Sequence, residues 1–392
     1  MSFSIEQLQH NFNNIFGLPQ NLRYFFSPGR VNLIGEHIDY NGGSVLPCPI
    51  NLGTFAVASI RNDTNFSIYS NNFPETGIIE FEINQIVFEK EHHWANYPKA
   101  VIQSLIEYGF VIPNGLDIYY LGNIPHGTGL SSSASIEVLT AVILKIYFNL
   151  SIGNPQLAKI CQNAENKFIG VSCGIMDQFA CVMGKKAHAI LLNCNNLNFE
   201  YTNLNLKDYQ IVIANTNKKR ELSNSEYNNR RHECNKALTE LQKVLNINDL
   251  CDLDMDTFNQ YSHLITNQKS YNRALHAVSE NLRTKNAVSA LNSNNLESFC
   301  KLLKESHISL RENYEVTGLE LDTIVEAAWK FPACVGARMT GAGFGGCTIN
   351  IVQKDAIDDF TKFLSKEYTR KTNITPTFYT VTADDGCKEI FK

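Results

Sequence analysis

A strand that runs through a glycine- and serine-rich loop into an amphipathic helix constrains this chain more than any other feature. The apolar run "LDIYYL" (116–121) predicts a strand, and "GNIPHGTGLSSSAS" follows it directly. Ile136, Leu139 and Ile143 then recur at helical spacing, which predicts a helix over about residues 131–148. A strand, a loop and a helix in this order are typical of proteins that mix both kinds of secondary structure.

The loop itself is typical of an anion site. Gly127 and Gly129 would let the backbone curl so that successive N–H groups point to one place, and the helix adds its own free N–H groups and the positive end of its dipole. Phosphate is the expected guest, although no Gly-Lys-Ser/Thr closes the loop as in a Walker A sequence. Charge on a triphosphate would then be offset by backbone N–H groups and a divalent metal, to which Ser133 could offer its hydroxyl. A serine-rich N-cap is the alternative, but one cap needs only one serine.

Four ionisable side chains crowd the segment "GRVNLIGEHIDYNGG" (29–43). Glu36, His37 and Asp39 lie between an apolar "VNLI" and a flexible "YNGG", and Arg30 precedes them. Such a cluster beside a hydrophobic run needs partners. The pattern alone allows a metal site, a knot of ion pairs or a cradle for a polar ligand. A metal site would need a further ligand, because residues spaced so tightly in a loop rarely close a coordination shell.

The segment "AENKFIGVSCGIMDQFACVMG" (164–184) adds two acidic residues. Its apolar stripe predicts a core-facing helix, and Asp177 lies just off that stripe in the first turn, after Gly174. An acid there could simply answer the helix dipole, which is worth about 0.3–1 kcal/mol. Glu165 falls on a separate predicted helix, where an exposed glutamate is usually solvated. Neither acid would stand out without the serine loop before them.

A second glycine-rich stretch, "GARMTGAGFGGCTINIV" (336–352), formally matches G-x-G-x-x-G through Gly341, Gly343 and Gly346. Its context argues against a dinucleotide fold, because the glycines lead into the strand "CTINIV" instead of a helix. A glycine loop between two strands can approach a ligand closely. It can equally be a bulged hairpin.

Composition places the chain in a broad class. At 392 residues with a net charge of −5, it lacks the basic excess of a nucleic-acid or anionic-membrane surface, and we expect neither as a partner. The first residues lack a signal peptide pattern, and no apolar run is long enough to cross a bilayer. Eleven cysteines without CxxC spacing suit reduced thiols in the cytoplasm. His92 and His93 are adjacent, lack metal-ligand spacing and are interpreted as surface residues.

Strands and helices alternate without a strict βαβ order, which indicates an α+β fold. The asparagine-rich stretch 193–208 has little pattern and is the best candidate for a seam between two halves, 1–207 and 208–392. The second half is richer in predicted helices, near 223–245, 272–292, 296–312 and 318–330, and closes with "PTFYTV" as its last predicted strand.

Taken in order and at these separations, the three segments resemble the signatures of the GHMP small-molecule kinases, and "GRVNLIGEHIDYNGG" resembles the signature of the galactokinase family within them. "GLSSSAS", "CGIMDQF" and "GAGFGGC" are also similar to galactokinases more than to mevalonate or homoserine kinases. The resemblance covers nearly the whole chain. Ile38 departs from the usual Thr, and His126 and Thr128 stand at variable positions.

The resemblance implies a two-lobed GHMP kinase fold, with an N-terminal lobe like domain 2 of ribosomal protein S5 and a C-terminal ferredoxin-like lobe with extra helices. It implies a site divided by role. The residues expected on the sugar are Glu36, His37, Asp39, Gly174, Asp177 and Tyr227, with Gly345 and Gly346 along the sugar side. Those expected around ATP are Trp94 and Tyr97 beside the adenine and Gly127, Thr128, Gly129, Leu130, Ser131, Ser132 and Ser133 around the triphosphate. Ser133 and Glu165 would hold Mg²⁺, and Arg30 and Asp177 would act at the transferred phosphoryl group.

The implied activity is transfer of the γ-phosphoryl group of ATP to the C1 hydroxyl of α-D-galactose, by a monomer in the cytoplasm. Arg30 would stabilise charge and Asp177 would orient the hydroxyl and accept its proton late. A related kinase for N-acetylgalactosamine or arabinose is one alternative, and a non-catalytic galactose sensor is another. The complete serine loop, Arg30 and Asp177 disfavour the sensor.

Overall fold

The computed structural model describes residues 3–19, 21–125, 128–171, 173–218 and 223–390. An extended sheet dominates the N-terminal half, with strand order β13-β1-β3-β6-β4-β5. Its strands are β1 (Arg23–Asn32), β3 (Pro47–Ile60), β4 (Asn65–Ser70), β5 (Ile79–Glu82), β6 (Leu116–Gly122) and β13 (Lys388–Ile390). The helices beside it are α1 (Ile5–Phe16), α2 (Asn96–Glu107), α3 (Ser132–Tyr147), α4 (Asn154–Ala164) and α5 (Met176–Met183).

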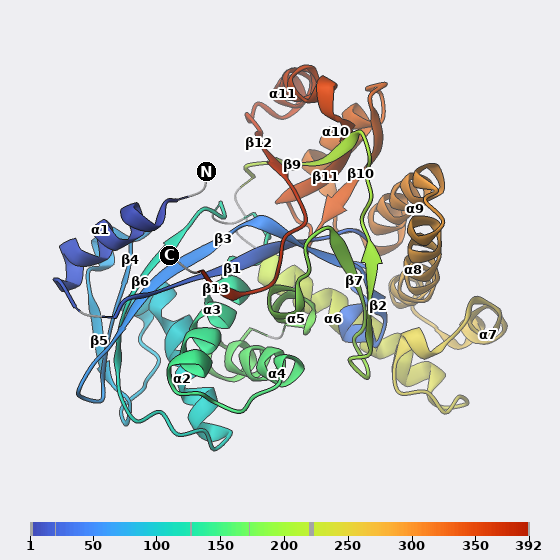
Figure 1. Ribbon diagram of the computed structural model, residues 1–392. Helices are drawn as coiled ribbons and strands as arrows, with labels where there is room; N and C mark the ends of the chain where they lie inside the picture. The colour runs from blue at the N-terminus through green and yellow to red at the C-terminus, as the bar shows by residue number, and fades with distance from the viewer. Residues whose placement is uncertain (1–2, 20, 126–127, 172, 219–222, 391–392) are drawn as a thin grey trace.

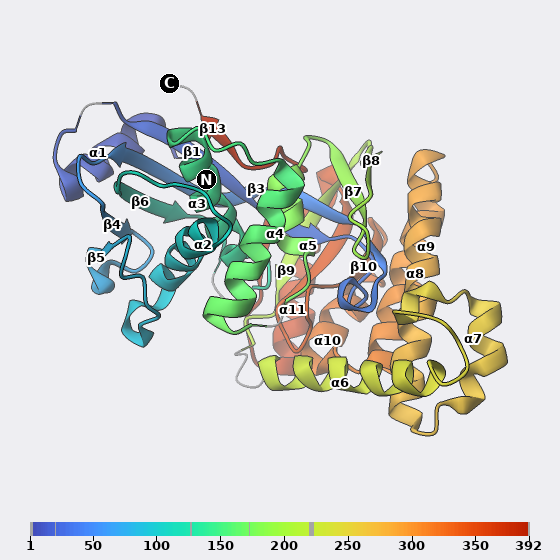
Figure 2. The ribbon, with the colours of Figure 1, turned by 90° about the horizontal axis from the view of Figure 1, so that it is seen from below.

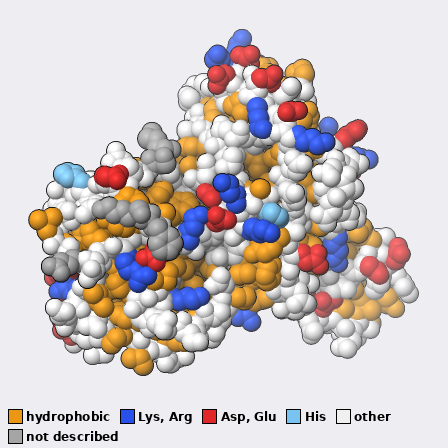
Figure 3. Space-filling model, viewed as in Figure 1, with side chains coloured by type: hydrophobic (Ala, Val, Ile, Leu, Met, Phe, Trp, Pro, Cys, Tyr) orange, Lys and Arg blue, Asp and Glu red, His pale blue; other side chains and the backbone are white. Residues whose placement is uncertain are grey.

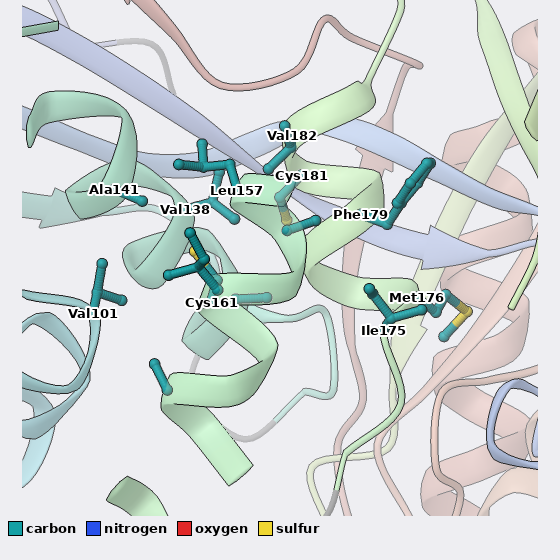
Figure 4. Packing of buried hydrophobic residues seen from close by; sticks show 14 of the residues in the cluster. Val101, Val138, Ala141, Leu157, Cys161, Ile175, Met176, Phe179, Cys181 and Val182 are labelled. Carbon is teal, nitrogen blue, oxygen red and sulfur yellow. The ribbon is translucent and has the colours of Figure 1, made fainter. Parts of the chain in front are cut away.

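The two faces of this sheet bury different helices because strand side chains alternate between faces. On β3, Val57 packs with α1, whereas its neighbours Ala56 and Ala58 pack toward α2, α3, α4 and α5. Figure 2 shows α3, α4 and α5 side by side next to β1 and β3. The close view in Figure 4 shows the apolar side chains of these helices in contact, with Val138 near Leu157 and Cys161. This dry core fixes the start of α3 and of α5 relative to β1.

The C-terminal half contains a four-stranded antiparallel sheet of order β10-β11-β9-β12. Its elements are β9 (Tyr209–Asn215), β10 (Cys334–Thr340), β11 (Cys347–Gln353), β12 (Thr377–Val381), α10 (Gly318–Ala328) and α11 (Ile357–Thr372). In chain order these six elements follow the ferredoxin-like pattern. The extra helices are α6 (Ser223–Leu241), α7 (Met255–Tyr261), α8 (Gln268–Asn292) and α9 (Leu296–Ser309), all between β9 and α10. Figure 1 shows this half in yellow to red, above and to the right of the first sheet.

The expected α+β, two-lobed fold is confirmed, and one detail of the expected element order is wrong. In the stretch 193–208, whose role as a seam stays a prediction, β8 (Phe199–Asn203) pairs with β7 (His188–Asn193). These two strands form a small sheet with β2 (Ser44–Val45). The strand "PTFYTV" is followed by another, β13, which returns to the first sheet and pairs with β1. Its few residues carry no strand pattern of their own. In the described part of the chain, no helix is both long enough and apolar enough to cross a membrane.

Candidate active site

Two cavities contain the residues that the sequence selected, one between the two halves of the chain and one within the N-terminal half. The smaller, of 210 Å³, is lined by residues from β1, the 33–44 loop, α5, α6 and the β10–β11 loop. These are Arg30, Glu36, His37, Asp39, Tyr40, Val171, Cys173, Gly174, Met176, Asp177, Tyr227, Gly341 and Ala342. The larger, of 810 Å³, includes Trp94, Tyr97, Ser132 and Ser133 among its lining. We call them the small cavity and the large cavity. Figure 3 shows the outer surface in the view of Figure 1, where Lys and Arg side chains lie beside Asp and Glu side chains near the middle; Arg30 and Glu36 of the small cavity are buried and do not belong to this surface.

Arg30 and Asp177 form a junction between the small cavity, which they line, and the serine loop, whose Ser132 and Ser133 line the large cavity. Nε and Nη2 of Arg30 each donate a hydrogen bond of 2.8 Å to the Asp177 carboxylate, and Nη1 donates to the Gly129 carbonyl at 2.7 Å. Ser131 Oγ also donates to Asp177, at 2.6 Å. Arg30 is 5% exposed, so this bidentate pair is well shielded on the arginine side. The last residues of β1, the serine loop and the first turn of α5 are thereby joined at one carboxylate.

The serine loop bends sharply where it meets Asp177. Ser131 has a φ of 63°, in the left-handed region that non-glycine residues rarely adopt, and Gly129 has a φ of 75°. The bend directs the Ser131 hydroxyl to Asp177, while Ser132 and Ser133 begin α3 and line the large cavity. Thr128 and Leu130 are buried, whereas Gly127 and its neighbour His126 lie outside the described residues.

Glu36 is buried at the wall of the small cavity and is already paired. Arg338 Nη2 lies 2.5 Å from Glu36 Oε2, and the N–H group of Gly341 donates to Oε1 at 3.0 Å. Burial raises the pKa of Glu36 to about 7, although both partners act to lower it. The knot of ion pairs and the polar cradle, which the sequence left open as alternatives, are therefore combined in one residue.

His37 is held as a neutral imidazole. Its Nε2 lies 3.1 Å from the Ala342 carbonyl and so donates, which leaves Nδ1 to accept from the Tyr40 hydroxyl at 2.8 Å. Burial lowers the pKa of His37 to about 3. Its ring lies 5.6 Å from that of Tyr227 and 4.8 Å from that of Tyr314, measured between centroids. His37 thus shapes the cavity wall with both ring nitrogens engaged.

Asp39 and Gly174 are in contact with each other in the wall of the small cavity. A Cβ placed on Gly174 would lie 1.7 Å from Asp39 Oδ2, so no larger residue fits here without displacing the carboxylate. Burial, followed by the charge of Asp177, raises the pKa of Asp39 to about 6. Asp39 therefore faces the small cavity as an acceptor whose protonation depends on its acidic neighbour.

Glu165 lies in a π-helical turn (Glu165–Ile169) that continues α4. Its carboxylate accepts a hydrogen bond of 2.7 Å from Gln178 Nε2 and one from Ser133. Gln178 also donates to the fully buried Glu137, at 3.0 Å. Burial and then the charge of Asp177 raise the pKa of Glu165 to about 7. In the described residues, no group of three or more His, Cys, Asp and Glu side chains could hold a metal by itself.

The wall of the large cavity combines an expected residue with two that the sequence did not single out for binding. Trp94 was expected beside the adenine, and His92 and His93 precede it on the same 3-10 turn (Lys90–Ala95) and also line this cavity. His92 was expected at the surface, but its side chain is only 18% exposed and its Nδ1 lies 2.5 Å from Nζ of the buried Lys99. Lys99 is buried on the amphipathic helix α2, and a lysine is almost never fully buried without a partner.

The β10–β11 loop reaches the small cavity through its first residues. Gly341 and Ala342 line it, whereas Gly345 and Gly346 do not. The Gly346 carbonyl instead accepts a hydrogen bond of 2.8 Å from the N–H group of Thr216, which turns this end of the loop toward β9. The expected place of the two later glycines on the sugar side stays a prediction. The loop does join two strands, as its sequence context indicated.

Family models match three parts of the chain. They are the galactokinase galactose-binding signature over residues 10–60, the GHMP kinase N-terminal domain over 96–185 and the GHMP kinase C-terminal domain over 287–370. Curated galactokinases are similar over their full lengths. That of Clostridium beijerinckii is 54% identical, covering 99% of both chains, and that of Bacillus subtilis is 50% identical, covering 98% of this chain and 99% of its own.

Solved structures agree. The galactokinase of Lactococcus lactis complexed with galactose matches with a TM-score of 0.96 and 44% identity, covering 98% of this chain and all of that one. The mevalonate kinase of Methanococcus jannaschii matches with a TM-score of 0.68 and 19% identity over 94% of this chain and all of its own. The second likeness concerns the fold alone.

Proposed function

This chain belongs to the galactokinase family of the GHMP kinases, and from this premise we propose how its two cavities divide the reaction. The protein is an ATP-dependent galactokinase. It transfers the γ-phosphoryl group of ATP to the C1 hydroxyl of α-D-galactose, which yields galactose 1-phosphate and ADP. We assign galactose to the small cavity and ATP to the large one. The observation that carries the assignment is the Arg30–Asp177 pair, which adjoins the serine loop and lines the small cavity.

Asp177 orients the C1 hydroxyl of the sugar in this proposal. Three donors already engage its carboxylate, two from Arg30 and one from Ser131, so the orientation of its oxygens is fixed before the sugar binds. A loose phosphoryl-transfer transition state asks little of a base. Asp177 therefore directs the hydroxyl oxygen at the γ-phosphorus and accepts its proton late, once the bond to phosphorus has largely formed.

Arg30 supplies positive charge at the transferred group. Its guanidinium is the buried cation at the junction, next to the backbone of the serine loop. Charge held in place before the reaction stabilises the transition state without reorganisation of solvent. The loop 127–133 and the start of α3 surround the triphosphate in the same proposal, through N–H groups and the helix dipole.

Ser133 and Glu165 are the residues we assign to Mg²⁺. The donor set fits a hard cation, since a hydroxyl and a carboxylate meet by a hydrogen bond at the edge of the large cavity. Two protein ligands are enough when phosphate oxygens and water complete the shell. The nearby Glu137 has a buried Oε1 without a hydrogen-bond partner in the described structure, so an acceptor oxygen at this place is left unsatisfied by the protein groups described. When bound, the cation neutralises charge on the β- and γ-phosphates.

Galactose is held by the remaining residues of the small cavity. Glu36 and Asp39 are acceptors for sugar hydroxyls, and Gly174 leaves room beside Asp39. His37 and Tyr227 form an aromatic side of the cavity. A site built to accept hydroxyl hydrogens leaves buried acceptors unpaired when one hydroxyl points elsewhere, so rejection of glucose can be large.

The larger organisation follows the same division. We propose an N-terminal lobe over 1–207 with the sugar signature and the phosphate loop, and a C-terminal lobe over 208–392 that closes the cleft. We also propose a monomer in the cytoplasm. All eleven cysteines are free thiols, which suits a reducing compartment.

A panel of sugars in an ATP-consumption assay, with and without Mg²⁺, tests the function. We expect galactose to be turned over far faster than N-acetylgalactosamine, arabinose or glucose, and only with Mg²⁺ present. Faster turnover of another sugar would show that this sugar, and not galactose, is the substrate. Tight binding of galactose without any product would identify a sensor.

A further inference from the structure

Arg338 connects the C-terminal sheet to the sugar-binding loop from behind. It lies on β10, is completely buried, and its Nη2 is 2.5 Å from Glu36 Oε2. Nη1 of the same guanidinium donates to the Leu33 carbonyl at 2.9 Å and approaches the Asn32 carbonyl at 3.3 Å. Arg338 thus holds both the side chain of Glu36 and the backbone that leads to it, and it is not among the described residues that line the small cavity.

The backbone around Glu36 depends on such outside partners, because it is irregular and buried. Gly35 donates its N–H group to Glu280 at 3.0 Å, and the Glu36 carbonyl faces His276 Nε2 at 3.1 Å. Glu280 and His276 both lie on α8. Gly341, directly after β10, donates its N–H group to the other carboxylate oxygen of Glu36. The sugar signature is therefore shaped by two elements that follow it in sequence by more than two hundred residues.

Of the described charged groups around Glu36, Arg338 is the one that neutralises its carboxylate. Glu280 is the second buried carboxylate, and Arg283 hydrogen-bonds it at 2.7 Å. Burial opposes the ionisation of Glu280, yet Arg283 and the other nearby cationic groups lower its pKa to about 2. Burial lowers the pKa of His276 to about 4 and also lowers the pKa of His307, so both are neutral. Arg338 is the cation whose guanidinium contacts Glu36 in the described structure.

We propose that Arg338 is a positioning residue that determines galactose affinity: its guanidinium keeps the Glu36 carboxylate ionised and aimed into the small cavity, while it touches neither substrate itself. The proposal rests on the assignment of galactose to this cavity. An ionised carboxylate only accepts hydrogen bonds, whereas a protonated one presents a donor and a single good acceptor. Without Arg338, Glu36 would rotate or take up a proton, and the sugar would lose an acceptor.

This role predicts different effects on the binding of the two substrates. Arg338 lies behind the small cavity and contacts the 32–36 segment, whereas ATP is assigned to the large cavity. A loss of Arg338 should therefore weaken galactose binding and leave ATP binding unchanged. It should also move the pH dependence of galactose binding, because a guanidinium that lowers the pKa of Glu36 is removed. The proton would then leave Glu36 only at higher pH.

The test compares Arg338→Lys and Arg338→Met with wild type. We expect the KM for galactose and its calorimetric Kd to rise about tenfold or more, the KM for ATP to stay within about twofold, and the pH at which kcat/KM for galactose levels off to move upward. Arg23→Met is the matched control, since it breaks a 2.7 Å ion pair with Glu389 in the distant N-terminal sheet. It should lower stability without a change in either KM.

Loss of thermal stability with an unchanged galactose KM and pH profile would overturn the proposal. If Arg338→Met does not fold, Arg338→Met combined with Glu36→Gln removes the buried charge that Arg338 leaves behind. Equal galactose Kd values for the double variant and for Glu36→Gln alone support the proposal, because Arg338 then acts only through Glu36. A further loss in the double variant contradicts it. Failure of wild type to phosphorylate galactose would instead refute the proposed function.

Discussion

Arg30 and Asp177 are joined by two parallel hydrogen bonds of 2.8 Å, so the end of β1 and the first turn of α5 present one charge-paired unit between the cavities. Such fork-to-fork pairs have a fixed orientation. Asp177→Asn keeps the shape but loses a charge and one acceptor. We expect kcat to fall by about a hundredfold to ten-thousandfold while the galactose Kd changes little. Near-wild-type turnover would remove Asp177 from the mechanism, and an Arg30→Ala variant altered only in sugar affinity would remove Arg30.

Ser131 provides a milder perturbation of the same carboxylate. Ser131→Ala deletes a 2.6 Å hydrogen bond to Asp177 and leaves the Arg30 pair in place. A hydrogen bond to a charged group contributes about 1.5–3 kcal/mol, which corresponds to a loss of about tenfold to a hundredfold in kcat. Steady-state kinetics would measure it against Ser151→Ala, a change at an exposed serine away from the site. Identical kcat values would show that Ser131 only shapes the loop.

Gly174 should be indispensable for sugar binding and irrelevant to ATP. Gly174→Ala places a methyl group 1.7 Å from Asp39 Oδ2, so the carboxylate must move out of the small cavity. The loss of one charged acceptor predicts a rise of about tenfold or more in the galactose Kd, measured by calorimetry, with the ATP Kd unchanged. Gly153→Ala is the matched control, since its added Cβ would meet open space. Equal effects of both changes would contradict the assignment of galactose to this cavity.

Galactose binding should weaken in two steps as pH falls, first near pH 7, where Glu36 takes up a proton, and again near pH 6. Burial and the charge of Asp177 raise the pKa of Asp39 to about 6, so below that pH Asp39 carries a proton and accepts fewer hydrogen bonds. Asp177→Asn removes the neighbouring negative charge, and the step near pH 6 should then move to lower pH. Calorimetric Kd values across the range decide this. A step near pH 6 that stays in place in Asp177→Asn would mean that another group titrates.

Lys99 should support ATP binding without contact to ATP. Its buried Nζ donates to Glu89 Oε1 at 2.9 Å, approaches the Val87 carbonyl at 3.3 Å and lies beside His92, so it ties down the turn that carries Trp94. Lys99→Met frees this turn, and we expect the KM for ATP to rise by about fivefold to tenfold with little change in the galactose KM. Lys90→Met, an exposed lysine on the same turn, is the control. Equal ATP KM values in both variants would show that the turn needs no such support.

Much of the fold could be predicted because its signals are local. The Ser4–Gln7 capping box begins α1, and apolar periodicity marks α3 and α5. β13 could not be predicted, since three residues with no apolar pattern form a strand only because β1 offers an unpaired edge. Pairing across long sequence separations escapes pattern reasoning in general.

The candidate site also contains residues that the sequence could predict and residues that it could not. Residue types and their spacing were enough to select the serine loop and the charged segment with Arg30, whereas Asp177 was selected through the family resemblance, and the structure brings all three together. Arg338 was missed, although a charged residue in the otherwise apolar strand "CVGARMT" is a signal for a buried partner. Its partner Glu36 lies 302 positions earlier, and no local pattern connects the two. The positions of Gly345 and Gly346 depend on how the loop is anchored to Thr216, which only the packed sheet decides.

The pairing of β13 with β1 has a consequence for how the protein is made. Tyr24 lies opposite Ile390, and Arg23 reaches Glu389 with hydrogen bonds of 2.7 and 2.8 Å. During synthesis, this outer edge of the first sheet stays uncovered until residues 388–390 have left the ribosome. Until then β1 presents an open strand edge at Tyr24–Phe26. Newly made chains therefore pass through a period in which chaperone capture or edge-to-edge association competes with completion of the lobe.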